Sequence, residues 1–143
     1  MSTLDRPRLI FHGAIVLLVG LFSGLPTTVE SLSGLGRSWH TAHEALIMMG
    51  IWMFAESSVL NALVLERREA SALVWSLVTM GYGFTAALVL GGATGTNVFG
   101  PGDTPVSIVA FLTAAIGILG AITAAALTLM GARAALQAAR RGA

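Results

Sequence analysis

The chain has no cysteine and no lysine, and only 10% of its 143 residues are charged. The absence of cysteine excludes disulfides, thiolate-ligated haem, iron–sulfur clusters and cysteine nucleophiles. A soluble domain carries about 25% charged residues, so this chain has too few polar side chains to cover a surface that faces water. The formal net charge of +1 offers no extended basic surface, and we therefore expect no nucleic-acid partner.

Apolar residues are abundant instead, at 55% of the chain with a mean hydropathy of +0.82. They gather in four runs, each close to or above the ~20 residues that a membrane helix needs. This pattern predicts an all-α integral membrane four-helix bundle that forms a single transmembrane domain over residues 1–143. The predicted spans are about 9–29, 39–65, 70–90 and 105–130. The first run is too long for the apolar core of a cleaved signal peptide, which disfavours that alternative.

The arginines indicate how the spans are oriented. Four spans return the chain to its starting side, so both termini lie on one side of the membrane. Arg37 falls on the opposite side, whereas the side of the termini carries Arg6, Arg8, Arg67, Arg68, Arg133, Arg140 and Arg141. Because basic residues accumulate in cytoplasmic segments, we predict cytoplasmic termini and a multi-pass protein of the cell inner (plasma) membrane.

Small residues spaced at helical intervals predict close contacts between helices. They occur in the first and fourth spans, as the pair Gly20 and Gly24 and as the stripe Ala114, Gly117, Ala121 and Ala125. Four short spans rich in glycine and alanine enclose little volume for both a cofactor and a substrate. We therefore expect a homo-oligomer with a pocket between subunits.

The second span holds the histidine that we single out. Ionisable residues inside a span are costly and are functional candidates by default. His43 lies about one turn below Trp39, an interfacial aromatic, and already within the apolar run. A neutral imidazole there needs a metal or a hydrogen-bond partner, so His43 is a candidate haem-iron ligand, with a hydrogen-bonded structural histidine as the alternative. Gly50, seven residues later on the same face, leaves a flat gap in which a macrocycle would fit.

The other two histidines have different settings. His40 faces Glu44 four residues later, which is typical of an interfacial pair in headgroups or water. His12 lies near the cytoplasmic end of the first span, far from His43, so the two should not clamp one metal within a subunit. We expect His12 to bond a backbone carbonyl, to pair with Glu56 or Asn61, or to bind a cofactor propionate.

Several further residues have both a structural and a functional interpretation. Tyr82, the only tyrosine, stands between Gly81 and Gly83 and either packs or aims its hydroxyl into a pocket. Glu56 is either a satisfied contact between helices or a buried acid. The methionines of the middle spans are expected in the core or lining a pocket, and they are Met48, Met49, Met53 and Met80.

Two segments carry a resemblance to a known family. Residues 11–20 (FHGAIVLLVG) and 39–43 (WHTAH) resemble the first two helices of the styrene oxide isomerases, small membrane enzymes with four helices. Residues 81–83 (GYG) and 99–102 (FGPG) are also similar to that family. The layout is similar along most of the chain, and the specific matches cover about a quarter of it.

The resemblance implies a homotrimer that binds haem b and rearranges a lipophilic aryl epoxide to a carbonyl compound, with His43 as the axial ligand of the ferric iron. The iron acts as a Lewis acid on the epoxide oxygen, a benzylic cation forms, and a 1,2-hydride shift follows. Met49 stands where the family has an asparagine, and the stretch that carries the family's pocket tyrosine reads Thr85-Ala86-Ala87 here. The resemblance therefore directs attention to Met49 and Tyr82 as catalytic candidates, and to His12 and Gly50 as residues beside the cofactor.

Three residues are expected to line a dry aromatic pocket that suppresses diol formation by excluding water; they are Trp52, Phe54 and Phe84. Two other functions remain open. A haem-carrying electron-transfer or sensor subunit would need two axial protein ligands. A non-enzymatic assembly or transport module would need no cofactor, and its small-residue stripes would serve only contacts between subunits.

Overall fold

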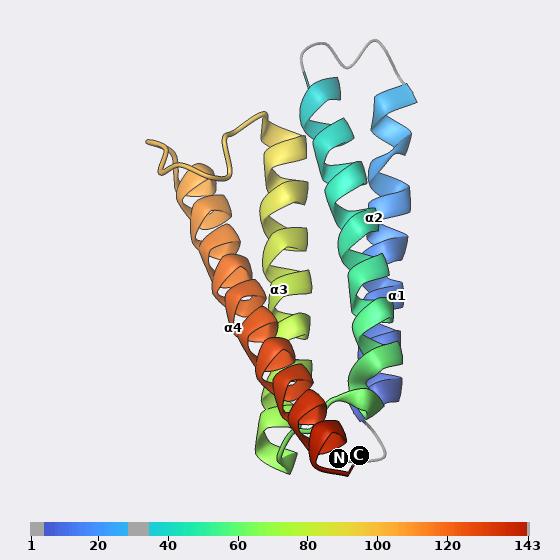
Figure 1. The fold of residues 1–143 in the computed structure, drawn as a ribbon. Helices are drawn as coiled ribbons and strands as arrows, with labels where there is room; N and C mark the ends of the chain where they lie inside the picture. Colours follow the sequence, from blue (N-terminus) through green and yellow to red (C-terminus); the bar gives the residue numbers. More distant parts are fainter. Residues whose placement is uncertain (1–4, 29–34, 143) are drawn as a thin grey trace.

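The computed structural model describes residues 5–28 and 35–142, and they form four long helices joined by short connections (Figure 1). The helices are α1 (Asp5–Ser23), α2 (Gly36–Val59), α3 (Arg67–Thr94) and α4 (Pro105–Gly142). Short 3₁₀ turns follow the first two helices, at Leu25–Thr28 and Leu60–Ala62. All four helices are long and apolar enough to cross a membrane, which confirms the predicted all-α transmembrane protein.

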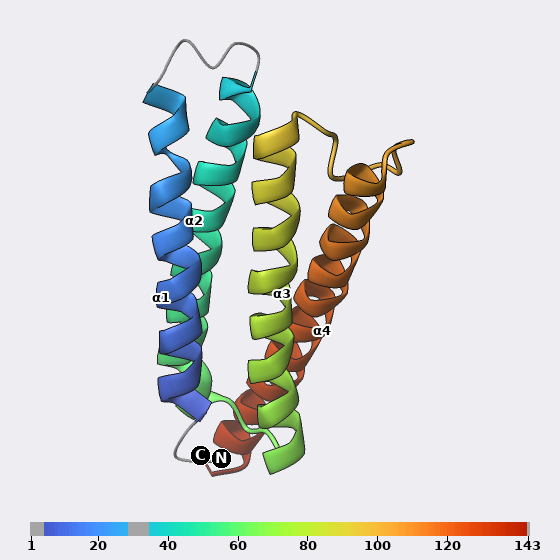
Figure 2. The same ribbon diagram turned by 180° about the vertical axis from the view of Figure 1, so that it is seen from behind.

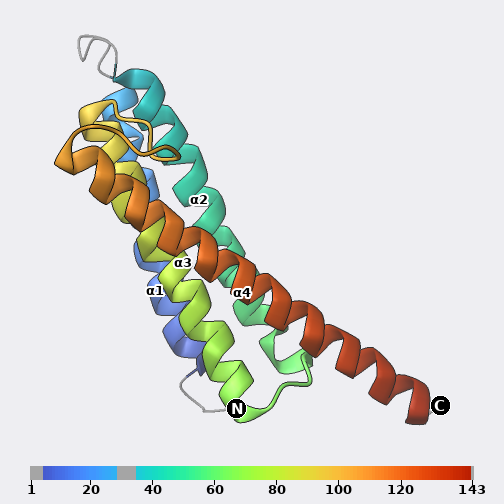
Figure 3. The same cartoon turned by 90° about the vertical axis from the view of Figure 1, so that its left-hand side faces the viewer.

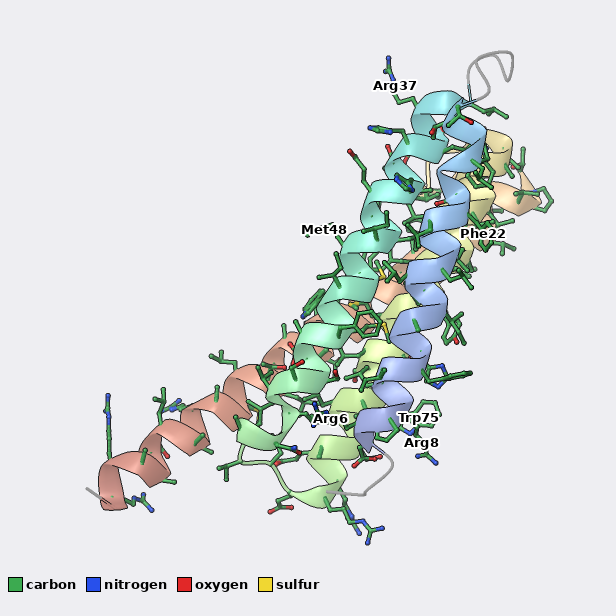
Figure 4. All side chains as sticks on the ribbon, turned by 90° about the vertical axis from the view of Figure 1, so that its right-hand side faces the viewer. Arg6, Arg8, Phe22, Arg37, Met48 and Trp75 are labelled. Carbon is green, nitrogen blue, oxygen red and sulfur yellow. The ribbon has the colours of Figure 1, made fainter. Side chains whose placement is uncertain are left out.

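The helices run alternately up and down, so α1 begins and α4 ends at the same end of the molecule (Figure 1). Arg6 and Arg8 lie at that end and Arg37 lies at the other, with the exposed Phe22 and Met48 nearer to Arg37 (Figure 4). We call these the arginine end and the Arg37 end. The separation of the charges is the one that the order of spans predicts.

Three helices pack as a group and the fourth lies against one of them. α1 and α2 form a close pair, and α3 contacts both of them (Figure 2). α4 packs chiefly on α3 and crosses it obliquely (Figure 3). The arrangement is therefore a three-helix group with a flanking helix, and not a symmetric four-helix bundle.

Small residues decide where the helices approach most closely. A Cβ atom built on Gly20 would lie 2.8 Å from the Ile47 amide nitrogen, and one built on Gly83 would lie 2.7 Å from the Gly117 nitrogen. Backbone therefore meets backbone at both seams, as close small-residue packing requires. The predicted stripe on α4 is confirmed at Ala114 and Gly117, but Ala124 takes the buried position that we expected for Ala125.

The ends of the spans differ from prediction because local hydrogen bonds end the helices. α1 stops at Ser23, and a 3₁₀ turn that contains Pro26 follows it. Proline has no amide hydrogen, so it cannot donate the bond that would continue the α-helix. The predicted end at residue 29 lies outside the described residues. The second span was predicted to reach residue 65, but the chain is already extended at Leu63 (ψ 137°). α3 begins early because Glu66 and Glu69 form a capping box.

The other helix boundaries follow the same logic. α3 was predicted to end at residue 90 but continues to Thr94, where Gly95 caps it. Gly95 has a φ of 70°, the left-handed conformation that glycine adopts without strain. α4 continues twelve residues beyond the predicted end at residue 130 because alanine and arginine favour helix after the apolar run has ended. Trp39 packs on α3, where a Cβ atom built on Gly92 would lie 2.8 Å from its ring.

Candidate functional site

The imidazole of His43 is held by the last turn of α1. Its Nδ1 atom lies 2.8 Å from the carbonyl oxygen of Gly20, across the seam between α1 and α2. The side chain is half-buried in this seam. His43 thus combines a fixed position with partial access from outside the protomer.

The Gly20 carbonyl can accept this bond because it lies in the last turn of α1, which ends at Ser23. The last carbonyls of a helix lack their usual amide partners. Here the Gly24 amide donates to the Leu21 carbonyl at 3.2 Å, and the Gly20 carbonyl accepts from the Ser23 hydroxyl at 2.7 Å as well as from His43. The helix end thereby supplies an oriented acceptor at the position of the ring.

This bond decides the tautomer of His43. A carbonyl oxygen only accepts, so Nδ1 must carry the hydrogen, and in a neutral imidazole Nε2 then has a free lone pair. No other residue in the described ranges bonds the ring. A histidine that donates one ring N–H to a backbone carbonyl while presenting the other nitrogen is the arrangement that metal-ligating histidines adopt.

Glycine at position 24 makes room for the ring. A Cβ atom built on Gly24 would lie 2.7 Å from Nδ1 of His43 and 2.8 Å from Cε1. Such distances are shorter than real contacts, so a larger residue would push the imidazole out of place. Gly24 therefore forms a cradle for the ring, and this observation agrees with the haem-ligand interpretation of His43.

Gly50 does not provide the open gap that we predicted. It is buried, and a Cβ atom built on it would lie 2.7 Å from Cβ of Leu17. The backbone of α1 therefore fills the space beside Gly50, and the prediction of a flat gap for a macrocycle at this position was wrong. Met49 is half-buried and packs against the core.

His12 and Tyr82 are brought together by the structure. The Nδ1 atom of His12 lies 2.9 Å from the Tyr82 hydroxyl, and the two rings meet edge to face with centroids 5.5 Å apart. The predicted partners of His12, Glu56 and Asn61, were wrong. The pair joins α1 to α3 and is partly exposed, with 38% of Tyr82 accessible.

His12 is separated from His43, as predicted. His43 bonds to Gly20, which lies eight residues or about 12 Å farther along α1 at 1.5 Å per residue. His12 faces α3 whereas His43 contacts α1 from α2. One protomer therefore does not bring these two imidazoles to a single metal ion.

Glu56 forms a satisfied contact between helices. Its carboxylate accepts a hydrogen bond from the Trp52 indole at 3.1 Å and from the Thr128 hydroxyl of α4 at 3.3 Å. The side chain is 93% buried. The structure thus favours the first of the two interpretations of Glu56, in which the acid links α2 to α4.

The expected aromatic lining is dispersed within the protomer. Trp52 bonds to Glu56, Phe54 lies near Gly13 of α1, and Phe84 packs on Gly117 of α4. Among the methionines, Met53 and Met80 are in the core, whereas Met48 is 65% exposed. The prediction of one pocket lined by all three aromatic residues is therefore not met by a single copy.

Four hollows of about 160 to 450 Å³ lie elsewhere on the protomer. Three of them lie along α3, α4 and the connection between these helices, and the fourth also touches Ser38 and Thr41 of α2. His43 lines none of the four. Residues 5–28 and 35–142 contain no group of three histidine or carboxylate side chains that would hold a metal ion unaided. A single imidazole is nevertheless sufficient for haem, because the porphyrin supplies the remaining in-plane ligands.

Sequence reasoning missed two contributors to the site. It treated Gly24 only as a packing residue, and it did not anticipate the Gly20 carbonyl as the acceptor. Pro26 was the available signal, since a proline shortly after a glycine marks a helix end and therefore free carbonyls. His40, by contrast, forms the predicted exposed pair with Glu44, at 3.2 Å.

Comparison with known proteins gives one finding that covers nearly the whole chain. A sequence profile of the family described as "Styrene oxide isomerase" matches residues 5–133. A search of curated proteins for relatives found no match to the chain.

Proposed function

The chain belongs to the styrene oxide isomerase family, and from this premise we propose that it is a haem b-dependent membrane isomerase that converts a lipophilic aryl epoxide to a carbonyl compound. The family assignment supports an isomerase. The identity of the cofactor, the reaction and the residues that serve it are our proposal.

The geometry of His43 carries the proposal. Its Nδ1 atom donates a hydrogen bond to the carbonyl oxygen of Gly20, 2.8 Å away. The lone pair of Nε2 therefore has a fixed direction and remains free to bind a metal ion. Gly24 keeps the ring in that orientation. These residues fit a haem iron, and His43 would hold it.

When held by His43, haem b would supply a Lewis acid for the isomerisation of the epoxide to the carbonyl compound, a rearrangement without net oxidation. The chain itself fixes the imidazole through the Gly20 carbonyl and the space left by Gly24. In the assembled protein, apolar side chains around the substrate would exclude water and so disfavour hydrolysis to the diol.

The remaining candidates have distinct assigned roles. Tyr82 and His12 form a hydroxyl–imidazole pair that can hold a proton between Oη and Nδ1, or bond a polar group of the cofactor or substrate. Met49, six residues after His43, is assigned a space-filling role, because it packs against the core and a thioether is only a weak acceptor.

We propose that the protein works as a homotrimer in which a second copy completes the pocket. His43 lines none of the four hollows described above, and the aromatic residues of one copy face different neighbours. Many large apolar side chains of the described helices are exposed, among them Phe22 and Ile51. These faces are available to lipid and to other subunits.

An absorption spectrum of the detergent-purified protein tests the proposal. We expect a Soret band in the wild type and at least a tenfold lower haem content in His43→Ala. His40→Ala is the matched control, because His40 lies three residues away and is exposed beside Glu44. A colourless wild type, or a His43→Ala variant with unchanged haem content, contradicts the assignment.

The reaction is tested with styrene oxide as the probe substrate. Isomerisation to phenylacetaldehyde should fall with haem content in His43→Ala and persist in His40→Ala. Haem binding without turnover, together with reversible low-spin redox spectra, would favour an electron-transfer or sensor subunit. The separation of His12 from His43 argues against that alternative within one protomer.

A further inference from the structure

The C-terminal part of α4 extends beyond the rest of the protein. α4 has 38 residues, or about 57 Å at 1.5 Å per residue, whereas the hydrocarbon core of a bilayer is about 30 Å thick. Its C-terminal end projects away from the start of α1 (Figure 3), although the two ends overlap in Figure 1. Only part of α4 can therefore lie inside the membrane.

The last firm attachment of α4 is at Gly131. Its carbonyl accepts a hydrogen bond from the Val64 amide at 3.2 Å, and a Cβ atom built on it would lie 3.0 Å from Leu63 and 2.9 Å from Leu65. Beyond Gly131, residues 132–141 have no described hydrogen bond to another helix. We call residues 132–141 the α4 tail.

The α4 tail is basic and has an apolar component. It contains Arg133, Arg140 and Arg141, and α4 has no acidic residue along its entire length. Leu129, Arg133, Leu136 and Arg140 are spaced by four, three and four residues, which places them in one stripe along the helix. Leu129 and Leu136 are 71% and 63% exposed.

Such a stripe suits the surface of a bilayer. Leucine side chains can enter the boundary between headgroups and acyl chains, while the long arginine side chains reach the phosphates. Cationic residues next to a membrane span are attracted to an anionic leaflet. The α4 tail continues directly from a membrane helix, so it emerges at this surface without a linker.

We propose that the α4 tail binds anionic phospholipid headgroups on the leaflet at the arginine end and lies in that interface. The family profile ends at Arg133, so most of the tail lies beyond the matched region. The inference does not depend on haem or on isomerase activity.

The absence of cysteine makes a clean test possible, because one introduced cysteine accepts a probe without background. We would attach an environment-sensitive fluorophore to Ala139→Cys in the full-length protein and reconstitute it in nanodiscs. We expect the probe to respond when a third of the phosphatidylcholine is replaced by phosphatidylglycerol. Relative to pure phosphatidylcholine, its emission should shift to the blue and its quenching by acrylamide should be at least twofold weaker. Both effects should decrease at high salt.

Charge variants give the matched comparison. Replacement of Arg133, Arg140 and Arg141 by glutamine should remove the response to phosphatidylglycerol. Replacement of Arg37, Arg67 and Arg68 removes the same number of charges elsewhere and should leave the response intact. A probe on Thr96→Cys, at the other end of the molecule, should not respond.

Several outcomes would overturn the proposal. Equal quenching in neutral and anionic nanodiscs would show that lipid charge does not act on the tail. A blue shift in both lipids that the arginine variants retain would indicate apolar packing or contact with a second copy. A response to inorganic phosphate in neutral nanodiscs, equal to that given by phosphatidylglycerol, would show a site for free anions in place of a lipid surface.

Discussion

The two nitrogens of the His43 ring have different tasks in this protein. Nδ1 donates to the carbonyl of Gly20 at the end of α1, and Nε2 is the nitrogen that we propose for the haem iron. The Gly20 carbonyl is free to accept because α1 ends before Gly24 and Pro26. The end of the helix therefore fixes the orientation of a side chain on another helix. Without this helix end, the ring at position 43 would lack the acceptor that fixes its tautomer and orientation.

At the residue scale, Gly24→Ala should damage the site without touching the ligand itself. The added methyl would lie 2.7 Å from Nδ1 and displace the ring. We expect haem affinity to fall about 10- to 100-fold, the range for loss of a partner that orients a ligand. Haem titration monitored at the Soret band measures this.

Gly36→Ala is the matched control for that change, because a Cβ atom at Gly36 meets nothing within 4 Å. It should bind haem as the wild type does, and it should be slightly more stable because alanine is the better helix former. Equal affinities of the two alanine variants would contradict the proposed cradle.

At the scale of the elements, α1 with α2 and α3 with α4 are packed through glycine. The contact between Gly83 and Gly117 brings two backbones together, and a Cβ atom on Gly83 would also lie 2.9 Å from the Thr113 carbonyl. Backbone atoms cannot rotate away as a flexible side chain can. The α3–α4 seam is therefore sensitive to a single methyl group.

Gly83→Ala should separate α3 from α4 and lower the free energy of unfolding by about 1–3 kcal/mol, as overpacking does in other cores. Thermal unfolding in detergent measures the loss. Gly100→Ala is the control, since its nearest neighbour is the Asn97 side chain at an ordinary 3.5 Å. Haem content at low temperature should not change, because His43 belongs to the other seam. An unaltered melting temperature in Gly83→Ala would show that this contact can relax.

At the scale of the whole molecule, charge is distributed between two ends. Arg6 and Arg8 lie at one end and Arg37 at the other (Figure 4). The order of the spans places seven arginines at the arginine end and one at the Arg37 end. Because basic residues accumulate on the cytoplasmic side, this difference predicts that the arginine end faces the cytoplasm.

Single cysteines at the two ends test this orientation. Thr96→Cys lies in the connection that follows α3, and Arg68→Cys lies in the first turn of α3. On intact cells a membrane-impermeant maleimide should label position 96, whereas position 68 should react only after permeabilisation. The reverse pattern would place the termini outside.

The amino-acid sequence alone determined the class of protein, the number of spans, the alternation of their directions and the residue to examine first. Composition and hydropathy are sums over individual residues, so they can be calculated without knowledge of the tertiary structure. The start of α4 was predictable at Pro105, because proline suits the first position of a helix. The end of α3 at Thr94, the extension of α4 and the early end of the second span were not.

Only the tertiary structure decided which side chains meet. His12 lies seven residues after Asp5, where α1 begins, and Tyr82 lies fifteen residues after Arg67, where α3 begins. They nevertheless bond at 2.9 Å, because the helices are offset along their axes. The same offsets place Leu17 over Gly50 and the end of α1 over His43. Contacts between helices depend on relative shift and rotation, and no single helix encodes these in its own sequence.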